Sequence, residues 1–368
     1  GDWRRPPATI SLALNVKTSG DAIAKPQFTA LQESIMKELL ASWEKLCVSS
    51  AGLRFVDINL RGTGQVMLQD NPLSGALFLA AIAWGSFAAG APQIAIGGIL
   101  ALLVATLTAY WVRADEKSLA AGLYGFNGIL VGLALPTFLA PGPLLWAYVI
   151  LGGAVSVIVM MWTVKAVTPW GAALTFPFVI ITWLLLLATY GFAGLTGAAL
   201  PAGKVVGAFQ LVASDPLRFS DFVQGVLHSV SQVFLKGNGL SGLLLLAGLA
   251  VNSFAAAAFA LAGAILAVVV AHLLGAESDL ITGGLLGFSP VLTAIALGTV
   301  FYRPSFRVAL FTALGTVMTV VAQAALNVAL TPFAIPALTA PFVLVTWMFM
   351  APRESFEPSA KRRSRKAA

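Results

Sequence analysis

Long apolar segments that carry almost no charge restrict the possible folds of this chain more than any other feature. Residues 91–111, 144–161, 175–190 and 255–272 are such segments. A helix needs about 20 predominantly apolar residues to cross the hydrocarbon core of a bilayer, and these segments approach or reach that length. They are too numerous for a signal peptide or a single membrane anchor. We therefore predict an all-α integral membrane protein that crosses the lipid bilayer many times.

The composition supports this class of protein and disfavours several others. Hydrophobic residues make up 58% of the chain and charged residues 10%, against about 25% charged residues in soluble domains. Cys47 is the single cysteine and there are two histidines, so we expect no internal disulfide, no metal site and no cofactor. No nucleophile–base pair stands out, so we expect no enzyme activity. The basic residues near the C-terminus fit a cytoplasmic topology signal, and we expect no nucleic-acid partner.

Three sequence motifs occur twice, in the same order and at nearly the same spacing. The pairs are Leu60–Gly75 with Leu227–Gly242, Gly122–Leu130 with Gly284–Leu292, and Leu174–Trp183 with Leu338–Trp347, at offsets of 167, 162 and 164 residues. The shared residues include Gln, Asn, Pro and Trp, so low sequence complexity does not explain the match. The pattern indicates two homologous halves.

Each half contains five predicted helical spans. They lie near residues 72–89, 92–112, 118–139, 143–162 and 169–190, and near residues 240–255, 256–274, 278–300, 304–325 and 332–351. An odd number of spans inverts the second half relative to the first, as in the inverted-topology repeats of many transport proteins. Lys and Arg residues then gather on the side of both termini, with Lys204 as the exception, so we expect both termini to be cytoplasmic.

One segment before each set of spans is too short and too polar to cross the membrane. These segments are Leu53–Val66 and Leu217–Val233, and each ends in a Gln-Val pair. We predict two half-membrane re-entrant pore helices that enter from opposite faces and meet near the centre, where protein or a water-filled cavity must surround them. The alternative is that both segments are surface linkers.

The predicted organisation has five parts. They are an N-terminal cytoplasmic extension (1–50) with one amphipathic helix over Phe28–Leu46, a first membrane repeat (51–190), an extracellular or periplasmic linker (191–216), a second membrane repeat (217–351) and a basic cytoplasmic tail (352–368).

The predicted spans contain almost no Asp, Glu, Lys or Arg, which disfavours an ion pathway and favours a neutral solute. Such a solute loses water on entry, so the protein must supply hydrogen-bonding groups instead. The repeated glutamines Gln65 and Gln232 offer amide groups. The repeated threonines Thr175 and Thr339, which each precede a proline by two residues, offer hydroxyl groups. The repeated phenylalanines Phe126 and Phe288 offer flat aromatic faces. Singly, each would more often be a packing or helix–helix contact; their duplication favours a shared site.

The repeated motifs resemble the signature of the urea transporter family, over about residues 53–351. The resemblance implies a passive urea channel of ten spans and two pore helices, assembled as a homotrimer with one pore per protomer. It also implies a slot-shaped filter that holds urea or close analogues. The slot walls would be Phe126, Leu130, Phe288 and Leu292, the oxygen ladder would include Gln65, Gln232, Thr175 and Thr339, and Val66 and Val233 would flank the path. Leu68 and Leu235 stand where the family often has Phe, so the slot is expected to be looser here.

The expected function is therefore facilitated diffusion of urea across a bacterial inner (plasma) membrane. One alternative is a channel for another small neutral solute, such as formamide, acetamide or ammonia. A second alternative is an ion-coupled secondary transporter on an inverted-repeat fold, which the scarcity of membrane carboxylates disfavours.

Overall fold

The computed structural model describes residues 38, 40–168, 171–208, 212 and 215–352. The chain divides into two compact units, Gly1–Leu53 and Arg54–Ala368. In the first unit, the described residues 38 and 40–49 are helical. The beginning of the predicted amphipathic helix and the whole basic tail lie outside the described residues.

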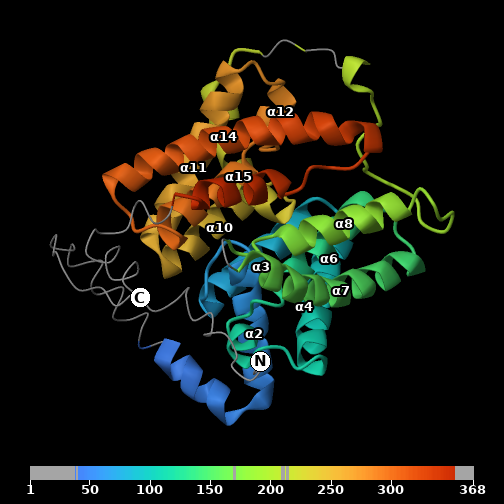
Figure 1. Cartoon of the computed structure of the whole chain (residues 1–368), viewed down its shortest axis with the longest axis vertical. Helices are drawn as coiled ribbons and strands as arrows, with labels where there is room; N and C mark the ends of the chain where they lie inside the picture. Colours follow the sequence, from blue (N-terminus) through green and yellow to red (C-terminus); the bar gives the residue numbers. More distant parts are fainter. Residues whose placement is uncertain (1–37, 39, 169–170, 209–211, 213–214, 353–368) are drawn as a thin grey trace, which may run out of the picture. The chain divides into compact units, whose positions relative to one another are not determined.

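The described part of the second unit is built from helices, and its one β interaction is an isolated bridge between Leu139 and Gly197. Figure 1 shows the helices in the order of the chain. The α-helices are α2 (Ala51–Gln65), α3 (Pro72–Ala88), α4 (Pro92–Trp111), α5 (Glu116–Ala120), α6 (Phe126–Phe138), α7 (Pro143–Val167), α8 (Phe176–Ala188), α9 (Phe219–Ser231), α10 (Gly239–Asn252), α11 (Phe254–Leu273), α12 (Ser278–Thr282), α13 (Phe288–Ile295), α14 (Phe306–Leu330) and α15 (Ala340–Met350). Short turns are η1 (Val206–Ala208), η2 (Gln232–Phe234), η3 (Ala296–Val300) and η4 (Thr331–Phe333).

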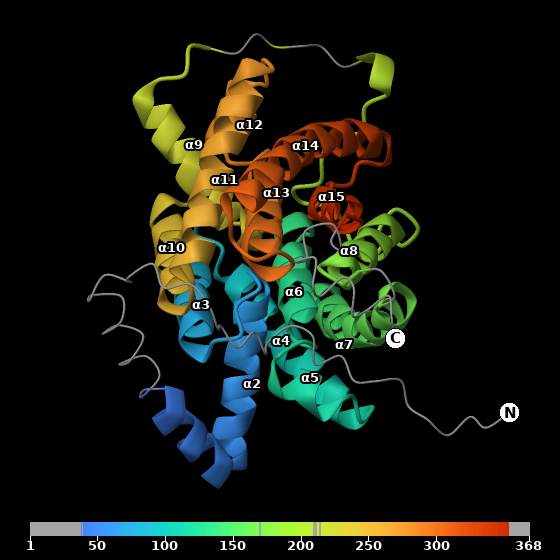
Figure 2. The same ribbon diagram turned by 60° about the vertical axis from the view of Figure 1, so that its left-hand side comes forward.

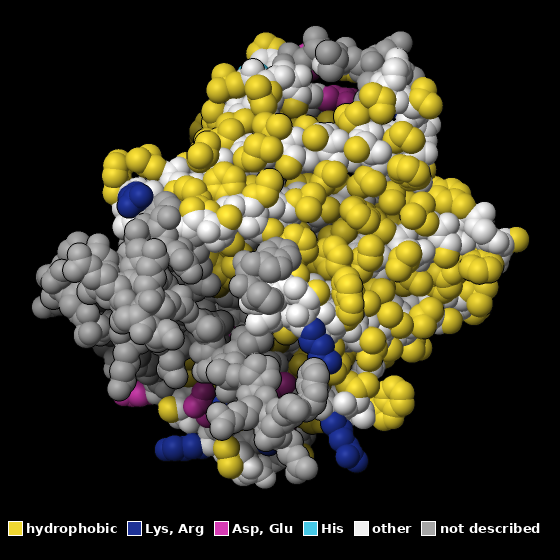
Figure 3. Space-filling view, in the orientation of Figure 1, with side chains coloured by type: hydrophobic (Ala, Val, Ile, Leu, Met, Phe, Trp, Pro, Cys, Tyr) yellow, Lys and Arg dark blue, Asp and Glu magenta, His cyan; other side chains and the backbone are white. Residues whose placement is uncertain are grey.

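Four helices in the described residues are long and apolar enough to cross a membrane: α4, α7, α11 and α14 with its extension η4. A fifth span results if α9 and α10, which bend by 72°, count as one. Large apolar side chains such as Trp162 on α7 and Leu314 on α14 are exposed, and hydrophobic side chains cover most of the face over α7, α8, α14 and α15 (Figure 3). Such a surface is stable against lipid and costly against water. The chain is a multi-pass membrane protein.

Several predicted spans are shorter or interrupted in the structure. The expected helix over 118–139 is divided into α5 and α6, and the one over 278–300 into α12, α13 and the π-turn η3. Both interruptions contain a glycine with positive φ, Gly122 (φ 73°) and Gly284 (φ 70°), a conformation that glycine adopts without strain.

The expected helices over 169–190 and 332–351 begin later than predicted, at Phe176 and Ala340. Proline lacks an N–H and favours the first turn of a helix. In each case a proline therefore sets the start, as Pro177 and Pro341 lie at the second helical position.

The two copies of each motif have the same local backbone. Leu68 and Leu235 both have positive φ after the Gln-Val pair, at 62° and 56°. Leu174 and Leu338, each directly before the repeated threonine, have φ values of 50° and 52°. Non-glycine residues rarely adopt this left-handed conformation, which costs on the order of 1–3 kcal/mol unless the surroundings hold it. The motifs therefore mark breaks in the helices.

Close packing at glycines positions α2 and α9. A Cβ added at Gly75 would lie 1.8 Å from the Leu60 carbonyl oxygen, and one at Gly242 would lie 2.3 Å from that of Leu227. Helices α3 and α10 are joined by the Ser74 hydroxyl, which donates to the Gly248 carbonyl at 2.7 Å. Helices α2 and α9 lie at opposite ends of the second unit (Figure 2). The close contacts at Gly75 and Gly242 pack α2 and α9, which lead into the Gln-Val pairs, against the helices that follow.

Candidate functional site

The two repeated glutamines make equivalent hydrogen bonds. The Gln65 Nε2 group, at the end of α2, donates to the Ala121 carbonyl oxygen at 2.9 Å. The Gln232 Nε2 group donates to the Gly283 carbonyl oxygen at 3.1 Å. Each acceptor directly precedes the positive-φ glycine at the break before α6 or α13. One N–H donor of each amide is therefore used within the protein, and within the described residues each Oε1 atom remains available as an acceptor.

The two repeated threonines contact one another. The Oγ1 atoms of Thr175 and Thr339 are 2.6 Å apart, and either hydroxyl can be the donor. Each threonine is 2% exposed and lies directly before the first residue of α8 or α15. One hydroxyl donates to the other, so lone pairs of both oxygens stay available for a further donor. At this contact the two copies of the repeated Leu-Thr-x-Pro-Phe motif meet.

The predicted slot walls start at the breaks that the glutamines hold. Phe126 is the first residue of α6 and Phe288 the first residue of α13. Leu130 and Leu292, one helical turn later on each helix, are fully buried. All four belong to or pack against one apolar cluster in the second unit, so each half places an aromatic ring and a leucine on one face of the same helix.

The valine of each Gln-Val pair and the leucine two residues later also belong to, or pack against, this apolar cluster. Val66 and Val233 are 1% and 2% exposed, and Leu68 and Leu235 pack against the cluster while partly exposed. The positive φ values of Leu68 and Leu235 turn the chain sharply between the Gln-Val pair and the next helix. The eight apolar candidates thus belong to, or pack against, the large apolar core of the second unit. The two glutamines and the two threonines are positioned by the hydrogen bonds described above.

Asn127 is a buried residue of this region to which the sequence argument gave no role. Its Oδ1 accepts the backbone N–H of Phe178 at 3.0 Å, and its Nδ2 donates to the Leu174 carbonyl at 3.5 Å. It therefore ties the start of α6 to the start of α8, on both sides of Thr175. The matching residue of the second half is Ser289, whose hydroxyl donates to Gln323 Oε1 at 2.6 Å instead. The signal in the sequence was the Asn that follows Phe126 inside a repeated motif.

The charged side chain one turn before Gln65 differs from its counterpart in the second copy of the motif, and the buried Lys236 directly follows Leu235. Arg61, one turn before Gln65, pairs with Asp57 at 2.8 Å and with Asp70 at 2.9 Å. Asp70 lies in the turn after Leu68, so this network joins α2 to the chain that follows it. His228 stands in place of Arg61 in the second half, and its Nδ1 lies 2.9 Å from the Thr282 carbonyl oxygen. Neither arrangement places an unpaired carboxylate at the twelve residues.

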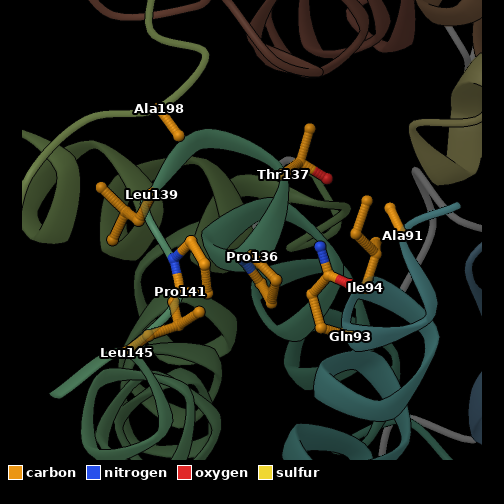
Figure 4. Close-up of a pocket in the computed structure, with 9 residues that line it drawn as sticks. All are labelled: Ala91, Gln93, Ile94, Pro136, Thr137, Leu139, Pro141, Leu145 and Ala198. Atoms are coloured by element: carbon orange, nitrogen blue, oxygen red, sulfur yellow. The ribbon is translucent and has the colours of Figure 1, made fainter. Parts of the chain in front are cut away.

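A pocket of about 210 Å³ lies elsewhere, at the ends of α4 and α6 (Figure 4). Gln93 and Thr137 are its polar side chains, and Pro136, Leu139 and Leu145 are among its apolar ones. None of the twelve predicted residues lines it. This pocket is therefore separate from the predicted filter, and Gln93 is a suitable control position for substitutions in the filter.

Comparison with known proteins gives an independent result. The profile of a family described as "Urea transporter" matches residues 56–354, a range that contains all twelve predicted residues. Urea transporter 1 of Ovis aries is 27% identical over 328 residues, which cover 86% of this chain and 80% of that protein. The urea transporter 1 proteins of Capra hircus and Rattus norvegicus are each 27% identical over 321 residues, with the same coverage.

Proposed function

Because this chain belongs to the urea transporter family, we propose that it carries urea across the membrane by facilitated diffusion through a narrow slot with the threonine pair at its centre. The observation that supports this mechanism is the 2.6 Å contact between Thr175 and Thr339. Two motifs 164 residues apart in sequence meet there, in apolar surroundings, with hydroxyl oxygens at the meeting point. Such a place suits a small polar solute that must exchange water for protein partners.

Urea is planar, with four N–H donors along its edges and one carbonyl oxygen. We propose that its flat faces slide over Phe126 and Leu130 on one side of the threonine pair, and over Phe288 and Leu292 on the other. Its N–H groups would move along the Oε1 atoms of Gln65 and Gln232 and the threonine hydroxyls. Because the glutamine amides already donate to Ala121 and Gly283, their oxygens are held in place before urea arrives. Such preorganisation lowers the cost of ordering each acceptor.

The proposed architecture is a pair of inverted five-span repeats, residues 51–190 and 217–351, with α2 and α9 as half-membrane pore helices. The interruptions inside spans are tolerable because neighbouring groups satisfy the freed backbone polar atoms, as Asn127 does for Phe178. The remaining boundaries are the extension 1–50, the outer linker 191–216 and the tail 352–368. We further propose a bacterial inner membrane location, cytoplasmic termini, and a homotrimer with one pore per protomer.

The second candidate is a channel that also accepts other small neutral solutes. Leu68 and Leu235 support it, because a leucine defines a flat slot less closely than an aromatic ring does. The test is stopped-flow light scattering on proteoliposomes with inward gradients of urea, formamide, acetamide or ammonia. A urea permeability well above those of the other solutes supports a urea slot. Equal permeabilities for urea and the amides would favour the wider channel. A requirement for a proton or sodium gradient would contradict passive diffusion.

A further inference from the structure

Two tryptophans connect the halves of the protein reciprocally. The Trp183 Nε1–H group on α8 donates to the Pro336 carbonyl oxygen at 2.9 Å. The Trp347 Nε1–H group on α15 donates to the Ala172 carbonyl oxygen at 2.8 Å. Each tryptophan lies eight residues after the threonine of its own half, and each acceptor lies three residues before the threonine of the other half. The two indole N–H groups thus form a reciprocal pair of hydrogen bonds between the two halves.

The segments that these indoles hold are the lead-in segments, residues 172–175 and 336–339. Neither is α-helical, and each contains a leucine in the left-handed region directly before its threonine. Some carbonyls of these segments accept N–H groups of the helix that follows, as Thr175 does from Val179 and Thr339 from Val343. The remaining backbone groups have no helical partners, and in apolar surroundings an unpaired carbonyl is costly. An indole donor from the opposite half supplies one partner to each segment. The position of each threonine therefore depends on a side chain of the other half.

Ring packing strengthens one of these connections. The rings of Phe176 and Trp347 have centroids 5.5 Å apart at an angle of 40°, and Phe176 directly follows Thr175. A Cβ added at Gly171 would lie 3.4 Å from Trp347 Cδ1, so this indole also lies close against the chain just before its acceptor. Trp347 therefore holds the Thr175 segment from both its beginning and its end.

We propose that Trp183 and Trp347 determine solute specificity as positioning residues. They hold the lead-in segments so that the Thr175 and Thr339 hydroxyls stay in contact, and this contact sets the width of the narrowest part of the path. Loss of an indole donor frees one segment, lets the threonines separate and admits wider solutes. The inference rests on the proposed threonine constriction.

The experiment compares wild type, Trp183→Phe, Trp347→Phe and the double variant in phosphatidylcholine–phosphatidylglycerol proteoliposomes. Phenylalanine keeps an aromatic ring and removes the N–H donor. The measured quantity is the ratio of N-methylurea to urea permeability, which cancels differences in the amount of incorporated protein. We expect the ratio to rise about two- to tenfold in each single variant, the range that one net hydrogen bond supports. The double variant should fall short of the product of the two, because both donors act on one contact.

Two further variants separate positioning from a general effect on stability. Trp111→Phe, at an 81% exposed tryptophan at the end of α4, should leave the ratio unchanged. Trp347→His, which retains a ring N–H, should return the ratio towards wild type. In addition, hydrogen exchange in Trp347→Phe should accelerate in residues 172–177 of the opposite half. This measurement needs only detergent-solubilised protein and applies even if transport is too slow to measure.

The outcomes distinguish the inference from the proposed function. If wild type conducts urea no faster than protein-free liposomes, the proposed function fails. If wild type conducts urea, but the tryptophan variants keep the wild-type ratio and exchange accelerates in their own half only, the positioning role is overturned while urea transport stands. A rise of the ratio in Trp111→Phe as large as in Trp347→Phe would also overturn it.

Discussion

Replacement of Gln65 by leucine tests the filter at the position where the structure gives the clearest geometry. Leucine has a similar volume but cannot donate to the Ala121 carbonyl, which now accepts from Gln65 at 2.9 Å, and it offers urea no oxygen. A buried hydrogen-bonding group left without its partner costs about 1–3 kcal/mol. If the barrier for urea rises by that amount, permeability falls roughly 5- to 150-fold, at about 1.36 kcal/mol per factor of ten.

The assay is stopped-flow urea entry into proteoliposomes, normalised to the amount of incorporated protein. Gln232→Leu should give a loss of similar size, because Gln232 donates to Gly283 in the same way. Gln65→Glu should be milder, since a carboxyl group keeps an acceptor oxygen and, when protonated, a donor. The matched control is Gln93→Leu, in the separate pocket between α4 and α6. Wild-type permeability in both Gln65→Leu and Gln232→Leu would refute the assignment of the glutamines to the path.

Two other substitutions test the constriction and the packing beside it. Thr175→Val removes one hydroxyl of the 2.6 Å pair and should lower urea permeability roughly 5-fold or more. The double variant with Thr339→Val should have a urea permeability little lower than that of the single variant. Strict additivity of the two losses in the same flux assay would show that the hydroxyls act separately. Gly75→Ala places a Cβ 1.8 Å from the Leu60 carbonyl oxygen and should lower the thermal unfolding temperature by several degrees or abolish folding. Gly142→Ala, where a Cβ meets nothing within 4 Å, should leave that temperature unchanged, and equal effects of the two alanines would contradict the packing argument.

The sequence predicted the class of fold well because the signal is strong and local. The spans predicted near residues 92–112 and 143–162 correspond to α4 (Pro92–Trp111) and α7 (Pro143–Val167), since the hydrophobic thickness of a bilayer fixes such lengths approximately. Both copies of the repeated motifs also contain positive-φ backbone, as at Leu174 and Leu338, which was not predicted from the sequence. Apolar composition alone did not reveal the interruptions at Gly122 and Gly284. Hydropathy is indifferent to a glycine turn whose polar groups are satisfied inside the protein.

The contacts among the candidate-site residues could not be predicted from the sequence. The threonines were chosen as separate oxygens along a path, and their direct contact comes only from the way α8 and α15 pack. The roles of Asn127 and of the two tryptophans were also missed. Each side chain acts on a segment more than 45 residues away in sequence, and no periodicity within one helix encodes such a partner. Trp183 and Trp347 were visible as a repeated pair, but the pattern did not indicate what they bond.

The most direct test of passive urea transport is stopped-flow light scattering on proteoliposomes of the wild-type chain, under an inward urea gradient and with no ion gradient or nucleotide. We predict urea entry at least ten times faster than in protein-free liposomes, unaffected by ionophores that collapse proton and sodium gradients, with a urea permeability that N-methylurea does not match. Urea entry at the rate of protein-free liposomes, or entry that appears only when a proton or sodium gradient is imposed, would contradict the account.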